Sequence, residues 1–279
     1  MVKVATDSVS DVPPDVAQEL GIAIIPLHIH FGTVTYRDKV DITSEEFYQK
    51  LQSSETPPTT SAPPPSYFAD IFDRLAQETS EILAVVLSRT FSATYDAALQ
   101  GVSLMKRKCR VEVVDSTSAI MGQGLLVIEA AKKALTGASL SELLPLVRKN
   151  IPGIHVRATM DTLKYLAKGG RIGKAQALLG SMLKINPILG IKDGVAFPFA
   201  KVRSRAQSIE RLAQFPTRFK KIKAIAVEYG TSIVEARALA SRIGSAFPHI
   251  PIYLSNVGPV IGTHTGPGVL AVSVLEDTE

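Results

Sequence analysis

The chain has 279 residues, of which 46% are hydrophobic and 20% charged, with one cysteine, no tryptophan and a formal net charge of +5. This composition is typical of a packed globular protein of one or two domains, and it excludes a disordered chain. The longest apolar stretches, such as residues 82–87, are far shorter than the ~18–20 residues of a membrane-spanning helix. The N-terminus has no long apolar core of the signal-peptide kind, and Cys109 alone can form neither an internal disulfide nor a thiolate zinc site. We therefore expect a cytoplasmic protein.

The charges are distributed unevenly along the chain. Residues 1–150 hold 14 Lys or Arg and 18 Asp or Glu, a net charge of −4. Residues 151–279 hold the remaining 17 of 31 basic and 8 of 26 acidic residues, a net charge of +9. This change of sign suggests two domains, of which the second faces an anionic partner. A Pro-Gly turn signal at residues 151–153 coincides with it, so we predict domains at residues 1–152 and 153–279.

Short apolar runs alternate with amphipathic segments. Five runs rich in Val, Ile and Ala predict strands buried on both faces, namely residues 2–6, 82–88, 111–114, 222–228 and 250–255. Residues 64–78 predict a helix, because apolar residues recur at helical spacing and a proline lies near the first turn. Capping-box patterns predict three more helix starts, Thr43 with Glu46, Ser139 with Glu142 and Ser232 with Glu235. The alternation predicts α/β layers with largely parallel strand pairing.

Two segments of the first half are rich in hydroxyl groups. The proline-rich residues 56–66 are either a loop ahead of a helix or a rigid loop that presents hydroxyls to a ligand. Residues 87–95 follow a predicted strand and precede a helix, which makes Ser92 a candidate N-cap residue. Free N–H groups after Ser92 could bind a carboxylate, although a serine that only caps its own helix fits the pattern equally well.

Two glycine-rich segments lie in the second half. Residues 258–268 contain four Gly and two Pro, which indicates a tight turn or a close approach of the backbone to a ligand. His264 lies in the middle of this segment and could donate a hydrogen bond to an anion. Residues 168–173 combine a flexible turn with Arg171, which could bind phosphate; the alternative is an ordinary helix C-terminus.

No enzyme motif is convincing. His28 and His30 alternate on a predicted strand, but the other histidines are isolated, so no metal site is predicted. The G-x-S-x-G elbow of serine hydrolases is absent from the sequence. The hydroxyl-rich loops favour a protein that holds an anion rather than one that cleaves it.

Taken together, the motifs resemble those of the DegV family of bacterial fatty-acid-binding proteins, in order and spacing, over essentially the whole chain. The resemblance rests on Thr6-Asp7-Ser8, Asp11-Val12-Pro13, Thr60-Ser61-Ala62-Pro63, Leu87-Ser88, Ser92-Ala93-Thr94-Tyr95, Asp115-Ser116, Gly170-Arg171-Ile172 and residues 184–189 and 262–268.

The resemblance implies a fold and a function. It implies two α/β domains, the first with a Rossmann-like parallel sheet and the second with a mixed sheet, and a ligand tunnel between them. The tunnel would hold a long-chain fatty acid such as palmitate, stearate or oleate. A separate ATP-binding subunit of fatty acid kinase would phosphorylate the bound carboxylate, and the acyl-phosphate would feed phospholipid synthesis. The chain itself would carry no catalytic residues, metal or cofactor.

The resemblance also implies roles for individual residues. Thr60 and Ser92 would bind the carboxylate, with Ser61 close by, and His264 would support it directly or through water. Arg171 matches an arginine that works with the kinase subunit. The sequence departs from the family pattern in replacing a Gly and a hydroxyl by Ala93 and Ala97, a Ser by Pro64, and an R-T-x-K-like stretch by residues 203–205.

Two other functions remain as alternatives. A phosphotransferase or hydrolase could act through Asp7, Asp115 and Ser92, and would then turn substrate over without a partner. A nucleic-acid-binding regulator could use the +9 half, but the sequence shows neither a recognition helix nor an aromatic platform. We expect no nucleic acid partner, and look instead to an acidic kinase surface, an acyltransferase or an anionic membrane surface.

Overall fold

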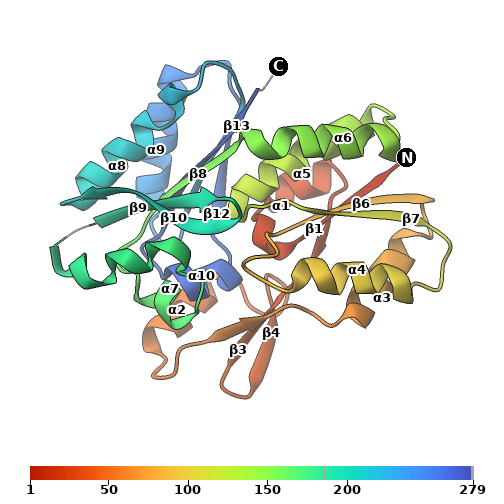
Figure 1. Ribbon diagram of the computed structural model, residues 1–279, viewed down its shortest axis with the longest axis horizontal. Coiled ribbons are helices and arrows are strands. Elements are labelled where there is room, and N and C mark those ends of the chain that lie inside the picture. Colours follow the sequence, from red (N-terminus) through yellow and green to blue (C-terminus); the bar gives the residue numbers. More distant parts are fainter. Residues whose placement is uncertain (185, 278–279) are drawn as a thin grey trace.

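The computed structural model describes the backbone of residues 1–184 and 186–277 and the side chains of residues 1–179 and 186–277. Ile185, in the motif of residues 184–189, lies outside this part. The described residues form three β-sheets flanked by helices (Figure 1). Among these helices, none is both long and apolar enough to cross a membrane.

The first sheet is parallel throughout and has the strand order β2-β1-β6-β7. Its strands are β1 (Lys3–Asp7), β2 (Ala23–Ile25), β6 (Glu81–Val86) and β7 (Arg110–Asp115). The two central strands, β1 and β6, are almost fully buried, as their content of Val, Ile, Leu and Ala predicts. The predicted Rossmann-like parallel sheet is confirmed.

The second sheet is mixed and has the strand order β10-β9-β8-β13-β11-β12. Its strands are β8 (Ile154–Thr159), β9 (Asn186–Lys192), β10 (Val195–Val202), β11 (Ile222–Tyr229), β12 (Ile252–Asn256) and β13 (Leu270–Glu276). Only β11 and β12 pair in parallel, and the other pairs are antiparallel. The predicted mixed sheet in the second half is therefore confirmed, whereas the expectation of largely parallel pairing was wrong here, because it holds for the first sheet alone.

Two predicted strands differ from the expectation of burial on both faces. β7 and β12 lie at the edges of their sheets, and most of their residues are only half-buried. The expectation was wrong for these two strands because an apolar run indicates only that a strand packs in the core. Whether a neighbouring strand covers its edge depends on the strand order of the sheet.

A small antiparallel sheet with the order β4-β3-β5 lies below the other two (Figure 1). Its strands are β3 (His28–Phe31), β4 (Val34–Arg37) and β5 (Thr59–Ser61). β5 comes from the proline-rich segment, so that segment is not only a loop. Five prolines flank this strand closely, two before it and three after it. Its three residues pair with β3 alone, which makes it an edge strand of the kind that tolerates nearby proline.

Helices cover the outer faces of the two large sheets (Figure 1). The α-helices are α1 (Pro14–Glu19), α2 (Ser44–Ser53), α3 (Pro65–Leu75), α4 (Thr94–Leu104), α5 (Ile120–Leu135), α6 (Leu140–Asn150), α7 (Lys164–Lys168), α8 (Arg205–Gln214), α9 (Ile233–Ala246) and α10 (Pro259–Thr265). Short 3-10 segments are η1 (Ser8–Ser10), η2 (Ile151–Gly153), η3 (Gly173–Lys184) and η4 (Pro216–Arg218). α3 and α4 pack on one face of the parallel sheet, and α8 and α9 on the outer face of the mixed sheet.

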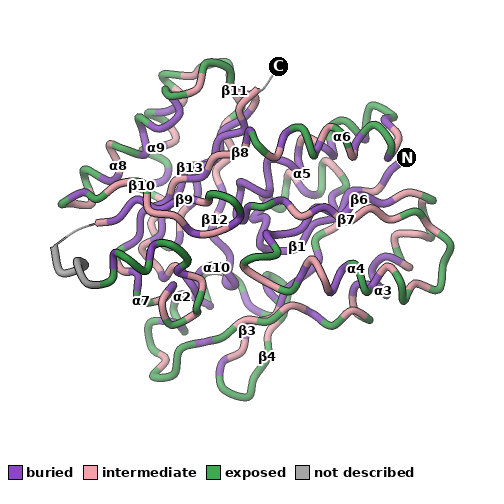
Figure 2. Tube along the Cα trace, viewed as in Figure 1, coloured by how far each residue is buried: buried purple, intermediate pink, exposed green. Residues whose placement is uncertain are grey.

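α5 lies between the two large sheets and is buried along most of its length (Figure 2). Its residues share one hydrophobic cluster with β1 and β6 and with Ala224, Ala226 and Leu275 of the mixed sheet. The predicted boundary at residues 151–153 falls on η2, where the chain passes from α6 to β8. The boundary stays a prediction, and the shared cluster shows that the two halves pack against each other closely.

The three helix starts predicted from capping patterns are confirmed. Thr43 and Ser139 form capping boxes with Glu46 and Glu142. The Ser232 hydroxyl accepts a hydrogen bond from the Glu235 N–H at the start of α9.

The glycine-rich residues 258–268 contain a helix, α10, where the sequence indicated a turn. Its one glycine, Gly262, allows this helix to pack closely against neighbouring elements. A Cβ atom at Gly262 would lie 2.7 Å from the Phe47 ring and 2.8 Å from the Tyr48 hydroxyl. The chain turns only after the helix, at Gly266, which has a positive φ of 76°.

Candidate functional site

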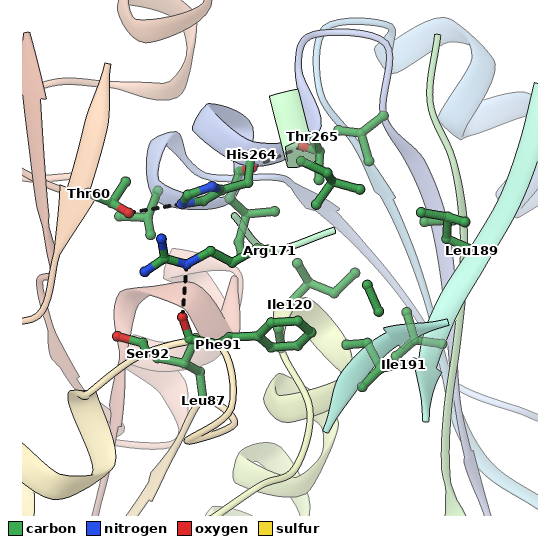
Figure 3. Close-up of a pocket in the computed structure, with 18 of the residues that line it drawn as sticks. Thr60, Leu87, Phe91, Ser92, Ile120, Arg171, Leu189, Ile191, His264 and Thr265 are labelled. Carbon is green, nitrogen blue, oxygen red and sulfur yellow. Dashed lines mark hydrogen bonds between the residues drawn. The ribbon is translucent and has the colours of Figure 1, made fainter. Parts of the chain in front are cut away.

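A cavity of about 340 Å³ lies where the end of β6 and the start of α5 face β8, β9 and β10 (Figure 3). Both halves of the chain line it. Most of the lining is apolar, including Leu87, Ile120, Val156, Leu189 and Ile191. Its volume is within the range of ~300–1,000 Å³ that is usual for small-molecule sites. The cavity occupies the position predicted for a ligand between the two halves.

Polar side chains gather at one end of this cavity (Figure 3). The Thr60 hydroxyl and the His264 Nε2 atom form a hydrogen bond of 2.9 Å, although 204 positions separate the two residues. Thr60 comes from β5 and His264 from the last turn of α10. The structure therefore brings together two of the residues that the sequence singled out, and each lines the cavity.

His264 is neutral in this environment. Its side chain is buried, and burial, aided by the nearby Arg171 guanidinium, lowers its pKa to about 4. The buried Nδ1 atom of His264 has no hydrogen-bond partner among the described residues. We assign the proton to Nε2, since this leaves Nδ1 as a bare acceptor rather than an unpaired buried donor. Thr60 then accepts from His264, and the hydroxyl hydrogen of Thr60 is free to donate into the cavity.

Ser92 lies across the cavity end from Thr60 (Figure 3). It is not the N-cap residue of α4, as the sequence suggested; that position belongs to Ala93, and α4 begins at Thr94. The Ser92 hydroxyl accepts a hydrogen bond from the Thr94 N–H at 3.3 Å and lies 2.8 Å from the Thr94 hydroxyl. The prediction failed by one residue because Ala93 adopts the N-cap position without any capping hydrogen bond, and sequence preference cannot indicate such a case.

Ser61 points away from Thr60, because neighbouring residues of a strand face opposite sides. Its hydroxyl lies 2.9 Å from the Nε2 atom of His30 on β3, and the His30 Nδ1 atom lies 2.8 Å from the Thr35 hydroxyl. Ser61 also lines the cavity, so the two residues of β5 contact it from adjacent positions. The sequence did not predict the contact of His30 with Ser61, because the spacing of His28 and His30 was considered only as a possible metal site.

Arg171 lies between Ser92 and His264 and extends along the cavity wall (Figure 3). Its Nε atom donates to the Phe91 carbonyl at 3.1 Å, and its Nη1 atom donates to the Gly169 carbonyl at 2.6 Å. The sequence associated Arg171 with a partner subunit. The structure places it in the lining of the cavity, beside the predicted carboxylate ligands.

A second cavity of about 640 Å³ adjoins the first and shares Thr60, Arg171 and His264 with it. Its lining is more polar and includes the exposed lysines Lys164 and Lys168 of α7. We call this second cavity the polar groove, and the first the apolar cavity. The three shared residues form the boundary between them.

Comparison with known proteins assigns the chain to a family. The family profile described as "Uncharacterised protein, DegV family" matches residues 1–277. The chain belongs to the DegV family. A DegV domain-containing protein of Halalkalibacterium halodurans is 35% identical over 98% of this chain and 97% of its own length.

Two solved DegV structures are similar to this chain over nearly its whole length. One, from Thermus thermophilus, is described as showing fatty acid binding of a DegV family protein; its TM-score is 0.89, with 30% identity and 99% of each chain covered. The other is DegV of Bacillus subtilis, described as a fatty acid binding protein, with a TM-score of 0.91, 28% identity and the same coverage.

The residues of the alternative enzyme do not meet in one place. Asp7 is fully buried and accepts hydrogen bonds from the Leu87 N–H and from Gln123, and burial raises its pKa to about 6. Asp115 accepts from the Thr117 N–H at the end of β7. Neither carboxyl group lines the cavity that holds Ser92. Within the described residues, no group of three or more His, Cys, Asp or Glu could hold a metal ion.

Proposed function

We propose that this chain binds a long-chain fatty acid, with the acyl chain in the apolar cavity and the carboxylate at the cluster of Thr60, Ser92 and His264. The observation that carries the proposal is an apolar cavity that ends in hydroxyl groups and a neutral imidazole. Each methylene buried there contributes about 0.8 kcal/mol. The fatty acid binding described for the Thermus and Bacillus DegV proteins supports the same ligand class.

The head-group site suits a carboxylate that must still react. Hydroxyl donors from Thr60 and Ser92 can each contribute about 1.5–3 kcal/mol to a charged acceptor. In the structure, the Arg171 guanidinium is engaged by the backbone carbonyls of Phe91 and Gly169 instead. The hydroxyl groups of Thr60 and Ser92 would then be the direct donors to the carboxylate, and such neutral donors leave its oxygens nucleophilic, while the Arg171 charge lies beside them.

We further propose that the chain presents this carboxylate to a separate ATP-binding kinase subunit in the cytoplasm, and that the acyl-phosphate serves phospholipid synthesis. The polar groove supports presentation, because Thr60 and His264 line it as well as the apolar cavity. The lining holds Lys164, Lys168 and Arg171 against one acidic residue, Glu55, and this excess of positive charge favours the approach of a phosphoryl donor. The separation of Asp7 and Asp115 from Ser92 favours a carrier over a chain that catalyses phosphoryl transfer itself.

Native mass spectrometry of the purified chain, followed by lipid extraction, tests fatty acid binding directly. We expect one fatty acid per chain. In titrations of delipidated protein, Ser92→Ala should weaken fatty acid binding by about 10- to 100-fold, the loss of one hydrogen bond to a charged group. Ser66→Ala removes an exposed hydroxyl on α3 outside both cavities and serves as the matched control.

Two results would contradict the proposal. A wild-type chain that neither copurifies with fatty acid nor binds it when offered is not a fatty acid carrier. A purified chain that consumes ATP or hydrolyses acyl esters without another protein acts as an enzyme, and the phosphotransferase or hydrolase would replace the carrier.

A further inference from the structure

The carboxyl group of Asp11 holds the start of the helix that carries His264. Asp11 follows η1, and its side chain is fully buried. Its Oδ1 atom accepts a hydrogen bond of 3.1 Å from the N–H of Gly258, the residue immediately before α10. Asp11 belongs to a motif that the family resemblance included but to which neither the fold nor the site gave a role.

Two further contacts fix the same end of α10. The Ser255 hydroxyl donates to the backbone carbonyl of Asp11, and the Tyr48 hydroxyl donates to the Val257 carbonyl at 3.1 Å. The segment that leads into α10 is therefore held by Asp11, which follows η1, and by Tyr48 of α2, both in the first half of the chain. α10 itself belongs to the second half.

Lys39 completes the arrangement. Its Nζ atom lies 2.6 Å from the Asp11 Oδ1 atom, and it donates to the Ser8 carbonyl at 3.4 Å. A Cβ atom at position 258 would lie 2.7 Å from the Lys39 Cε atom and 2.9 Å from Asp11 Oδ1, so that only glycine allows this close approach. Because a buried ion pair contributes little net stability, a precise geometric role is a better reason for it than stability alone.

We propose that Asp11, paired with Lys39, is a positioning residue for the carboxylate site: by fixing Gly258 it sets the place of α10, so that His264 reaches Thr60. The inference rests on the proposed fatty acid site. His264 lies six positions after Gly258, about 9 Å along a helix, and a helix of this length transmits a shift of its first residue to its last turn. Asp11 touches no ligand in this arrangement and acts only through the helix.

The test compares a fatty acid with the fatty alcohol of equal chain length, both titrated into the delipidated full chain. Both ligands use the apolar cavity, but only the acid needs the carboxylate site. Asp11 has a positive φ of 50°, which glycine and asparagine tolerate. Asp11→Gly removes the carboxyl group without backbone strain and should lower the acid-to-alcohol affinity ratio about tenfold. Asp11→Asn keeps an acceptor for the Gly258 N–H and should restore most of the ratio.

A stability control separates positioning from general damage. Val274→Ala makes a hole in the buried cluster between β13 and the helices α8 and α9, away from both cavities, and should weaken acid and alcohol equally. If Asp11→Gly lowers both affinities equally, or leaves the ratio unchanged, the positioning role is wrong while the fatty acid site stands. If the wild-type chain shows no preference for acid over alcohol, it is the proposed carboxylate site that fails.

Discussion

The two cavities that meet at His264 differ in the polarity and exposure of the residues that line them. The apolar cavity is lined by strands and helix starts that pack into the cores of both halves, with side chains such as Leu189 and Val156. The polar groove is lined by α7, by residues of α2, β5 and α10 and by loops, and it includes the exposed Lys164 and Lys168. A rigid apolar wall can hold a chain by its shape, whereas an exposed cationic wall can attract an anion without enclosing it. The difference suggests that one cavity retains the ligand and the other gives access to its head group.

The largest effect should come from filling the apolar cavity. Ala196 lines it from β10, directly opposite Ile191 on β9, which lines it too. Ala196→Phe places a ring where three or four methylene groups of the acyl chain would lie. Because each buried methylene contributes about 0.8 kcal/mol, the affinity for an 18-carbon acid should fall by about 100-fold. Titration of the delipidated variant with fatty acids of decreasing length checks this, because short chains should bind almost as they do to the wild type.

Lys201→Phe is the control for this variant. It adds the same ring to an exposed position of the same strand, outside both cavities. If Ala196→Phe binds the 18-carbon acid as tightly as Lys201→Phe does, the acyl chain does not lie in the apolar cavity.

The second largest effect concerns His264, which lies at the boundary between the apolar cavity and the polar groove. We expect it to make the stability of the chain depend on pH. Its folded-state pKa of about 4 lies below the ordinary value of 6.5. Between these pH values, the unfolded chain binds a proton that the folded chain does not, so acidification favours unfolding. This contribution to stability is complete above pH 6.5 and is lost as the pH falls toward 4.

His264→Gln removes this titration and keeps an amide that can donate to Thr60. In urea unfolding of delipidated protein, the stability advantage of the wild type over the variant should shrink by about 2 kcal/mol between pH 7.5 and 4.5. His249→Gln, at an exposed position, should follow the wild-type profile. A constant difference between wild type and His264→Gln would show that His264 is not held neutral.

The sequence predicted the elements whose causes are local. β1, β6 and β11 appear as short segments rich in Val, Ile and Ala, and Thr43 and Ser139 mark helix starts, because each signal lies within a few residues. The edge positions of β7 and β12 could not be predicted, since they depend on which strands become neighbours. α10 was missed for a similar reason, because contacts with Phe47, Tyr48 and Asp11 hold a segment whose own composition favours turns.

The site was predicted in part, and mostly through the family resemblance. Thr60 and His264 do meet, but nothing in their spacing of 204 positions shows it. The placement of Arg171 at the boundary depends on carbonyls of Phe91 and Gly169, and backbone acceptors leave no trace in a sequence. The hydrogen bond between Ser61 and His30 depends on the register of β3 and β5. This register could not be predicted, because the proline-rich sequence around β5 did not indicate a strand.

The smallest effect should come from the polar groove. Lys164→Gln with Lys168→Gln removes two charges that form no ion pair with a described residue, and neither lysine lines the apolar cavity. Fatty acid affinity should therefore stay unchanged. Phosphorylation by the proposed ATP-binding subunit should fall about threefold at low salt and recover relative to wild type near 1 M salt, where the Debye length is about 3 Å.

Lys106→Gln with Lys108→Gln makes the same change of charge on an exposed turn before β7, and it separates the groove from the net charge of the chain. If both double variants slow phosphorylation equally, the overall field of the protein attracts the donor and the groove has no special part. If the Lys164 and Lys168 variant weakens fatty acid binding itself, the head group extends into the polar groove, and the boundary at Thr60, Arg171 and His264 does not divide two functions. Only a loss of phosphorylation with intact binding supports one cavity that retains the ligand and another that gives access to it.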